Sequence, residues 1–287
     1  MSKLLQRTLA YLRIIEQLLE RLIPVHLYRY DRYPSFNYLC RKYLLLQLIG
    51  KELCGHALEV GFGLGDWLLT LLNIGFEVVG VEISERAINI LKQKLSPHVK
   101  NKASILAGDF MKMNFYKKFD IVFALEVLEH IQDDETAIRK LSNFLSPDGK
   151  LIISVPAHMK YWTQWDIIAG HYRRYERGEL IHKLLNCKLQ VKKLLCYGFP
   201  FGTIISLIIA PFIPKLKGSI NNRTKLSGIY RPLEERLPLI FNIIIKLMLP
   251  IQLKLQNLFL DKDFGHGYLI VASMRGSAQD SIIDSHH

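Results

Sequence analysis

The sequence predicts an α/β fold in which a mostly parallel sheet carries helices on both faces. Short apolar runs alternate with helix-length segments from residue 57 to residue 155, a pattern typical of parallel strands covered on two sides. The first apolar run also breaks into a glycine-rich turn that continues as a helix pattern, at 57–67 (ALEVGFGLGDW). Strand, glycine turn and helix in this order predict a ligand site at one edge of the sheet.

The alternation gives each element in turn, from apolar periodicity and from breaking residues. Strands are expected near 57–61, 76–81, 103–107, 119–124 and 150–155, and helices at 66–74, 85–95 and 134–145. A turn is expected at the SPDG sequence before the fifth strand. Ligands bind such sheets outside the carboxyl ends of the strands, so residues that directly follow the strands are the candidates for a site.

The glycine turn has the spacing G-x-G-x-G, at Gly61, Gly63 and Gly65. Glycine lets a ligand approach the main chain without meeting a Cβ atom. A dinucleotide fingerprint would place its last glycine where Asp66 stands, and a carboxylate is an unfavourable neighbour for a pyrophosphate. A ligand without a phosphate therefore fits this turn better.

Two acidic residues follow the next strands. Glu82 ends the second predicted strand, where a carboxylate can accept hydrogen bonds from both hydroxyls of a ribose, and Asp109 follows the third. The alternative for Glu59 and Asp109 is that they are solvated residues at strand ends.

Taken together, E-x-G-x-G-x-G from Glu59, the acid Glu82, the Gly108-Asp109-Phe110 sequence and the 119–131 run FDIVFALEVLEHI resemble the class I S-adenosylmethionine-dependent methyltransferases. The resemblance implies a Rossmann-like, seven-stranded sheet whose last strand lies near 266–274, and S-adenosylmethionine as cofactor. It also implies a role for each matching position: the methionine part lies along Glu59, Gly61, Gly63 and Gly65, the ribose at Glu82 with Ile83, the adenine at Asp109 and Phe110, and the far wall at Leu125 and Glu126.

The loop at 156–177 follows the fifth predicted strand and is rich in aromatic, basic and histidine residues. Such loops carry substrate residues, and the D-x-x-x-x-H-Y-R-R-Y pattern resembles a bacterial methyltransferase subgroup linked to lipid or polysaccharide pathways. We predict His171 as a general base oriented by Asp166, with His130 as a further catalytic candidate. The predicted substrate contacts are Tyr161, Trp162, Trp165, Tyr172 and Arg174.

Structural alternatives stay open for the same residues. Asp166, Arg173 and Arg174 would equally form a hydrogen-bond network that fixes the loop, and His130 would equally be a packing residue.

Five segments are expected along the chain. They are an N-terminal helical lid at 1–50, the cofactor-binding core at 51–198, an apolar helical insert at 199–264, the final strand of the core at 265–275 and a disordered tail at 276–287. Residues 3–23 have the periodicity of an amphipathic helix, and charges run through it, which excludes a signal peptide. The apolar stretches at 197–214 and 237–253 are interrupted by prolines and predict short helices that cap the substrate side or face lipid, not membrane spans.

Charge and cysteine content set the expected partners and location. The formal net charge is +12, and its basic excess is greatest outside the core: residues 1–50 carry eight Lys or Arg against three acids, and residues 199–260 eight against two. Basic charge beside apolar sequence suits an anionic membrane surface, whereas a nucleic-acid enzyme would show basic and aromatic residues around its site. The four cysteines are widely spaced and the histidines are not clustered in sequence, so we predict no metal and a cytoplasmic location, peripheral to the inner face of the membrane.

The predicted function is methyl transfer from S-adenosylmethionine to a hydrophobic small molecule, of lipid, isoprenoid or polyketide-like character. The first alternative is an RNA or protein methyltransferase, although no Asn/Asp-Pro-Pro-aromatic motif stands at 124–126. The second is a non-methylating protein that uses the bound cofactor as a scaffold.

Overall fold

The computed structural model describes residues 35–49, 54–212 and 238–275. These residues fall into two compact units. The first unit contains an N-terminal helix and the helices of the insert, and the second contains most of the sheet with its surrounding helices and loops. The predicted helix at 3–23 and the tail at 276–287 lie outside the described residues.

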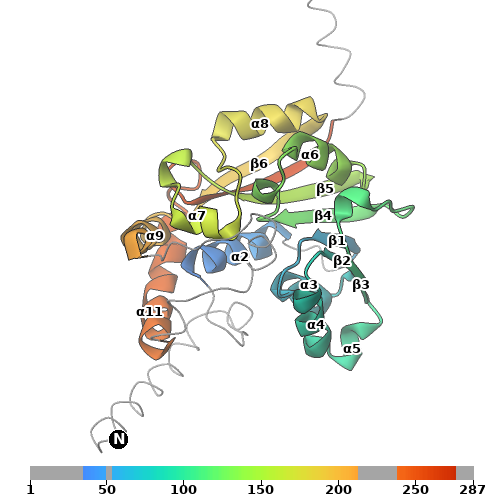
Figure 1. Ribbon diagram of the computed structural model, residues 1–287, viewed down its shortest axis with the longest axis horizontal. Coiled ribbons are helices and arrows are strands. Elements are labelled where there is room, and N and C mark those ends of the chain that lie inside the picture. The colour runs from blue at the N-terminus through green and yellow to red at the C-terminus, as the bar shows by residue number, and fades with distance from the viewer. Residues whose placement is uncertain (1–34, 50–53, 213–237, 276–287) are drawn as a thin grey trace, which may run out of the picture. The chain divides into compact units, whose positions relative to one another are not determined.

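The sheet has seven strands in the order β3-β2-β1-β4-β5-β7-β6 (Figure 1). Strands β1 to β5 pair in parallel, and β7 runs antiparallel to β5. This confirms the predicted mostly parallel, Rossmann-like sheet with a late-arriving last strand. The strands are β1 (His56–Val60), β2 (Glu77–Glu82), β3 (Ala103–Ala107), β4 (Phe119–Leu125), β5 (Leu145–Pro156), β6 (Leu189–Tyr197) and β7 (Gly267–Met274).

Helices join the parallel strands, and capping residues in the sequence fix where two of them begin. Ser84 accepts a hydrogen bond from the amide of Ala87, and Asp133 accepts one from Thr136, as expected for N-cap residues. The helices of this unit are α3 (Asp66–Ile74), α4 (Glu85–Lys94), α5 (Pro97–Lys100), α6 (Asp134–Ser142), α7 (Gln164–Ala169) and α8 (Arg177–Asn186), with 3-10 turns η2 (Phe110–Lys112), η3 (Leu128–His130) and η4 (Met159–Tyr161). Strand β4 lies in the middle of the sheet and is buried on both faces except at Asp120, which explains its nearly continuous apolar sequence.

The structure differs from the expected boundaries at the start of β5. We expected a turn at 146–149 and a strand from 150, but β5 extends from Leu145 to Pro156. Phe119 pairs with Leu145 whereas Ile121 pairs with Lys150, so the SPDG residues form an irregularity in a continuous strand. Helix α6 likewise ends at Ser142, three residues before the predicted end at 145.

The first unit is built from α2 (Phe36–Ile49), α9 (Phe201–Ile209) and α11 (Pro238–Gln256). The 3-10 turn η5 (Ala210–Phe212) follows α9 in the chain and belongs to the second unit. Polar side chains connect the three helices: Asn37 donates to Ser206, and Gln252 both accepts from the amide of Phe201 and donates to the carbonyl of Phe199. We expected Pro250 to interrupt the second apolar stretch, but α11 continues through it. Among the helices that the structure describes, none combines the length and hydrophobicity that a membrane span requires.

Candidate active site

The glycine turn, Glu82 and Glu126 lie along one edge of the sheet because the strands before them are neighbours. Val60 at the end of β1 is in register with Val81 of β2 and with Ala124 of β4. The chain turns away from the sheet directly after each of these strands. The residues that the sequence placed at separate strand ends are therefore brought to a common edge.

Glu82 is the centre of this edge. One carboxylate oxygen accepts from the amide of Gly63 at 2.8 Å, and the other accepts from Ile83 at 2.8 Å and from Ser84 at 2.9 Å. An ionised carboxylate offers about four acceptor positions. The three backbone amides already occupy three of them. Glu82 thus holds the glycine turn in place, and about one position is left for a hydroxyl unless the Gly63 amide is released.

Gly63 marks open space above the turn. Its φ is +54°, a backbone conformation that residues other than glycine rarely adopt. A Cβ atom added there would meet nothing within 4 Å. Gly65 differs, because a Cβ atom there would overlap the side chain of Leu91 in α4. Gly65 is therefore required for helix packing, whereas Gly63 leaves room for a ligand.

The predicted adenine end and far wall lie at the ends of β3 and β4. Asp109 accepts from the amide of Met111 at 3.0 Å and begins η2, while Phe110 is buried. Ile83 is 50% exposed. Its apolar side chain is therefore available at this edge for packing against the planar adenine base. Leu125 is buried, and the carboxylate of Glu126 accepts from Ser154 at 2.9 Å.

These features fit S-adenosylmethionine: open space at the glycine turn, an acceptor for a ribose hydroxyl and an exposed apolar side chain beside it. Glu59 is buried at the end of β1, below the turn. The individual contacts to the cofactor remain predictions.

The loop after β5 is built around a buried ion pair. Asp166 accepts from Nε of Arg174 at 2.8 Å and from Nη2 at 3.0 Å, and also from the amide of Thr163 at 2.8 Å and from Nδ1 of His171 at 2.9 Å. Burial alone would raise the pKa of Asp166, but the hydrogen bond from His171 and the charge and hydrogen bonds of Arg174 outweigh it and hold the pKa at about 2. Arg174 is 3% exposed, which favours the structural alternative over the predicted grip on a substrate.

A second anchor holds the other half of the same motif. Asp134 accepts from the hydroxyl of Tyr175 at 2.8 Å and pairs with Arg173 and Lys183, each at 2.9 Å. Burial, and then the charge of Asp134 and the hydrogen bond to it, raise the pKa of Tyr175. The D-x-x-x-x-H-Y-R-R-Y sequence therefore fixes the loop at two points.

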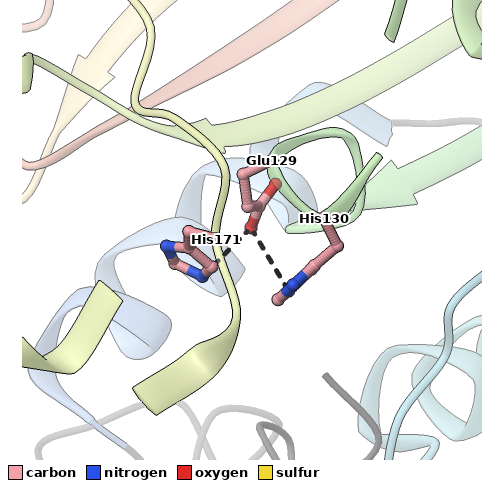
Figure 2. Close-up of side chains that lie close together, drawn as sticks. All are labelled: Glu129, His130 and His171. Atoms are coloured by element: carbon pink, nitrogen blue, oxygen red, sulfur yellow. Dashed lines mark ion pairs between the residues drawn. The ribbon is translucent and has the colours of Figure 1, made fainter. Parts of the chain in front are cut away.

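This loop brings His171 against His130 and Glu129, at the end of η3 (Figure 2). Nε2 of His171 lies 3.9 Å from Oε1 of Glu129, and Nε2 of His130 lies 4.0 Å from the same oxygen. Burial, and then the charge of His171, lower the pKa of His130 to about 4, so His130 is a neutral imidazole at pH 7. The predicted pair of His171 and Asp166 is thus present, and His130 is part of the same cluster.

Glu129 was missed by the sequence reasoning, although it directly precedes His130. Its side chain is fully buried, and an acid next to a histidine just after a buried strand was the signal that could have identified it. His158 was missed too: it is buried at φ +61°, with Nδ1 2.9 Å from Glu176.

The predicted substrate aromatics lie on the same loop. Tyr161, Trp162 and Trp165 are half-buried, and Tyr172 is exposed. The ring of Tyr161 packs edge-on against His158. Their contact with a substrate remains a prediction.

Comparison with known proteins agrees with this fold. Residues 58–153 match the methyltransferase domain family. A methyltransferase of Bacillus thuringiensis is 32% identical over 112 residues, 38% of this chain and 51% of that protein. Sterol 4-C-methyltransferase of Caenorhabditis elegans is 28% identical over 100 residues, 34% of this chain and 30% of that protein. The chain thus spans about half or less of the length of these relatives.

The YcgJ protein of Bacillus subtilis has the same fold, with a TM-score of 0.51 and 15% identity over 82% of this chain and 98% of that one. Residues 58–153 are thus a methyltransferase domain, in agreement with the predicted resemblance to the class I S-adenosylmethionine-dependent methyltransferases. S-adenosylmethionine is the cofactor of this class.

Proposed function

We propose that the chain transfers the methyl group of S-adenosylmethionine to a hydrophobic small molecule. The observation that carries the proposal is the sheet edge, where Glu82 fixes a glycine turn that leaves open space above Gly63. The matched domain supports the chemistry. The class of acceptor rests on the apolar insert described below.

The bound cofactor would supply an electrophilic methyl group on a sulfonium, and the chain's own residues would position it. Gly63 and Glu82 would hold the cofactor, and the loop around His171 would hold the acceptor in line with the methyl group. Orientation of this kind can supply effective molarities of about 10⁵ to 10⁸ M, more than the roughly 10²- to 10⁴-fold of a general base. A base is therefore needed mainly for a hydroxyl acceptor.

The direct test measures S-adenosylhomocysteine released when the full chain is incubated with S-adenosylmethionine and fractions of a lipid extract. Release that depends on an apolar fraction supports the proposal. Release that depends instead on added RNA or protein would support the first alternative. Cofactor binding without release in any fraction would support the non-methylating alternative.

The apolar surface of the first unit supports a hydrophobic acceptor or a lipid surface. Ile204, Leu207 and Ile208 on α9 and Leu247 and Ile251 on α11 are exposed, and the two helices contact each other. Where exposed apolar side chains gather on neighbouring helices, they mark an interaction site more often than a single exposed residue does. The prediction that the insert caps the substrate side involves both units and stays a prediction.

We therefore also propose peripheral binding to anionic membranes. Apolar burial contributes roughly 25 cal/mol per Å², and each basic residue near an anionic surface about 1 kcal/mol. Most basic residues of 199–260 lie outside the described residues, so the electrostatic part of this proposal rests on the sequence.

Sedimentation with liposomes tests it. The chain should sediment with anionic vesicles, bind neutral ones less and be partly released by salt, because salt screens charge and not apolar burial. Replacing Ile208 and Ile251 together by Glu should reduce sedimentation, whereas Tyr116→Glu, at a fully exposed position of the other unit, should not. Equal binding to anionic and neutral vesicles would remove the electrostatic part, and an unchanged double variant would remove the assigned surface.

A further inference from the structure

Glu129, His130 and His171 form a compact cluster of metal-ligating groups that methyl transfer alone does not explain. One ligand atom from each lies within 4.8 Å of the other two. Glu129 and His130 come from η3, and His171 follows α7 after the turn at Gly170. Dashed lines in Figure 2 join the carboxylate of Glu129 to both imidazole rings, and the side chain of Glu129 is fully buried.

The partners of the two rings determine which nitrogen carries the hydrogen. Nδ1 of His171 is 2.9 Å from a carboxylate oxygen of Asp166, which also accepts from Arg174. Nδ1 of His130 is 3.4 Å from the carbonyl oxygen of Gly170. Both partners are acceptors, which favours the hydrogen on Nδ1 and leaves Nε2 as the ligand atom of each ring in its neutral form.

Both lone pairs then face the same carboxylate oxygen, at 3.9 and 4.0 Å. Three potential ligand atoms thus converge in a mostly buried place, with all of them within 4.8 Å of one another. A histidine whose outer nitrogen is held by a carboxylate or a carbonyl is the usual arrangement around bound metals, because that bond fixes the ring and its tautomer. Both rings have this arrangement.

We propose that Glu129, His130 and His171 bind a divalent transition-metal ion such as Zn²⁺ or Mn²⁺. Two imidazoles and one carboxylate form a ligand set that suits these ions and leaves a position open for water or for an oxygen of a substrate. With metal–ligand bonds of about 2.1 Å, tetrahedral ligands lie about 3.4 Å apart. The distances to Glu129, now 3.9 and 4.0 Å, would therefore close by about 0.5 Å on binding.

The histidines are not clustered along the chain, so their spacing predicted no metal. His130 and His171 come together only because the loop after β5 is anchored against η3, where Tyr172 donates its amide hydrogen to the carbonyl of Glu129 at 2.8 Å. Binding of the ion does not depend on the proposed methyl transfer. Its use does: an ion here would bind an acceptor hydroxyl and lower its pKa, and Nε2 of His171 would then be a ligand and not the general base.

The test is calorimetric titration of the full, tag-free chain, freed of metal by a chelator, with Zn²⁺ and with Mn²⁺. We expect about one ion per chain, and at least tenfold weaker binding in Glu129→Gln and in His171→Asn. His56→Ala is the matched control, because His56 also lies near two carboxylates, Glu77 at 3.1 Å and Asp120 at 3.7 Å, but on the surface. Its affinity for the ions should be unchanged.

The proposal is overturned if neither ion binds, or if the two ligand variants bind as well as the wild type. An equal loss in His56→Ala would place the binding on the surface and would also overturn it. If the ligand variants do not fold, the visible absorption spectrum of Co²⁺ added to the wild type decides. A spectrum typical of Co²⁺ coordinated by histidine supports the site. The spectrum of the hydrated ion refutes it. None of these readouts uses methyl transfer, so failure of the metal site and failure of the proposed activity are distinguishable.

Discussion

Replacement of Glu82 by Ala separates cofactor binding from general stability. The carboxylate has about one acceptor position that the amides of Gly63, Ile83 and Ser84 do not use. Loss of one hydrogen bond from a ribose hydroxyl to a charged acceptor reduces the free energy of binding by about 1.5 to 3 kcal/mol. Glu82→Ala should therefore weaken S-adenosylmethionine binding by roughly 10- to 150-fold, and more if the turn at Gly63 moves.

Calorimetric titration with S-adenosylmethionine measures this change. Glu77→Ala is the matched control, since Glu77 begins the same strand at the opposite edge and its side chain is exposed, with ion pairs only to His56 and Lys117 among the described residues. Glu77→Ala should bind the cofactor like the wild type. Unchanged affinity in a folded Glu82→Ala variant would refute the assignment of Glu82 to the ribose.

Three further predictions concern the turn and the loop. Gly63→Val should abolish cofactor binding in calorimetry, because its side chain would fill the open space and strain a φ of +54°; retained binding would place the cofactor elsewhere. Because the pKa of Asp166 is about 2 in the folded chain and 3.8 ordinarily, this carboxylate contributes about 2 kcal/mol of stability that is fully present above about pH 4 and is lost as the pH falls through about 2. Denaturant unfolding across pH should show this loss in the wild type and not in Asp166→Asn. His171→Ala should lower turnover and leave the Kd for S-adenosylmethionine nearly unchanged; unchanged turnover would make His171 structural.

Local sequence patterns predicted the core because parallel strands and glycine turns each have a recognisable pattern of residues. The strand that ends at Glu82 and the helix that begins at Asp66 have the boundaries, within a residue, that apolar periodicity and breakers indicated. The continuity of β5 through 146–149 was not predictable in this way, because turn residues in a strand are tolerated where pairing with β4 continues on either side.

The contacts made by the loop after β5 could be predicted from the sequence only in part. The spacing of Asp166 and His171 predicted their contact, since five residues are enough to close one hydrogen bond across a short helix end. The contact of His171 with Glu129 joins residues that are far apart in sequence and follows from the anchoring of the loop, which no local pattern records. Arg174 shows the same limit, because a basic residue in a substrate loop and a buried partner of Asp166 look alike until burial is known.

The measurement that tests the account most directly follows the methyl group itself. The wild-type chain and Gly63→Val are each incubated with S-adenosylmethionine labelled in its methyl group and with an apolar extract, and label is counted in the organic phase alongside S-adenosylhomocysteine. We predict equal amounts of transferred label and released S-adenosylhomocysteine with the wild type and neither with the variant. Cofactor that binds the wild type but yields no labelled product with any extract would contradict the proposed activity.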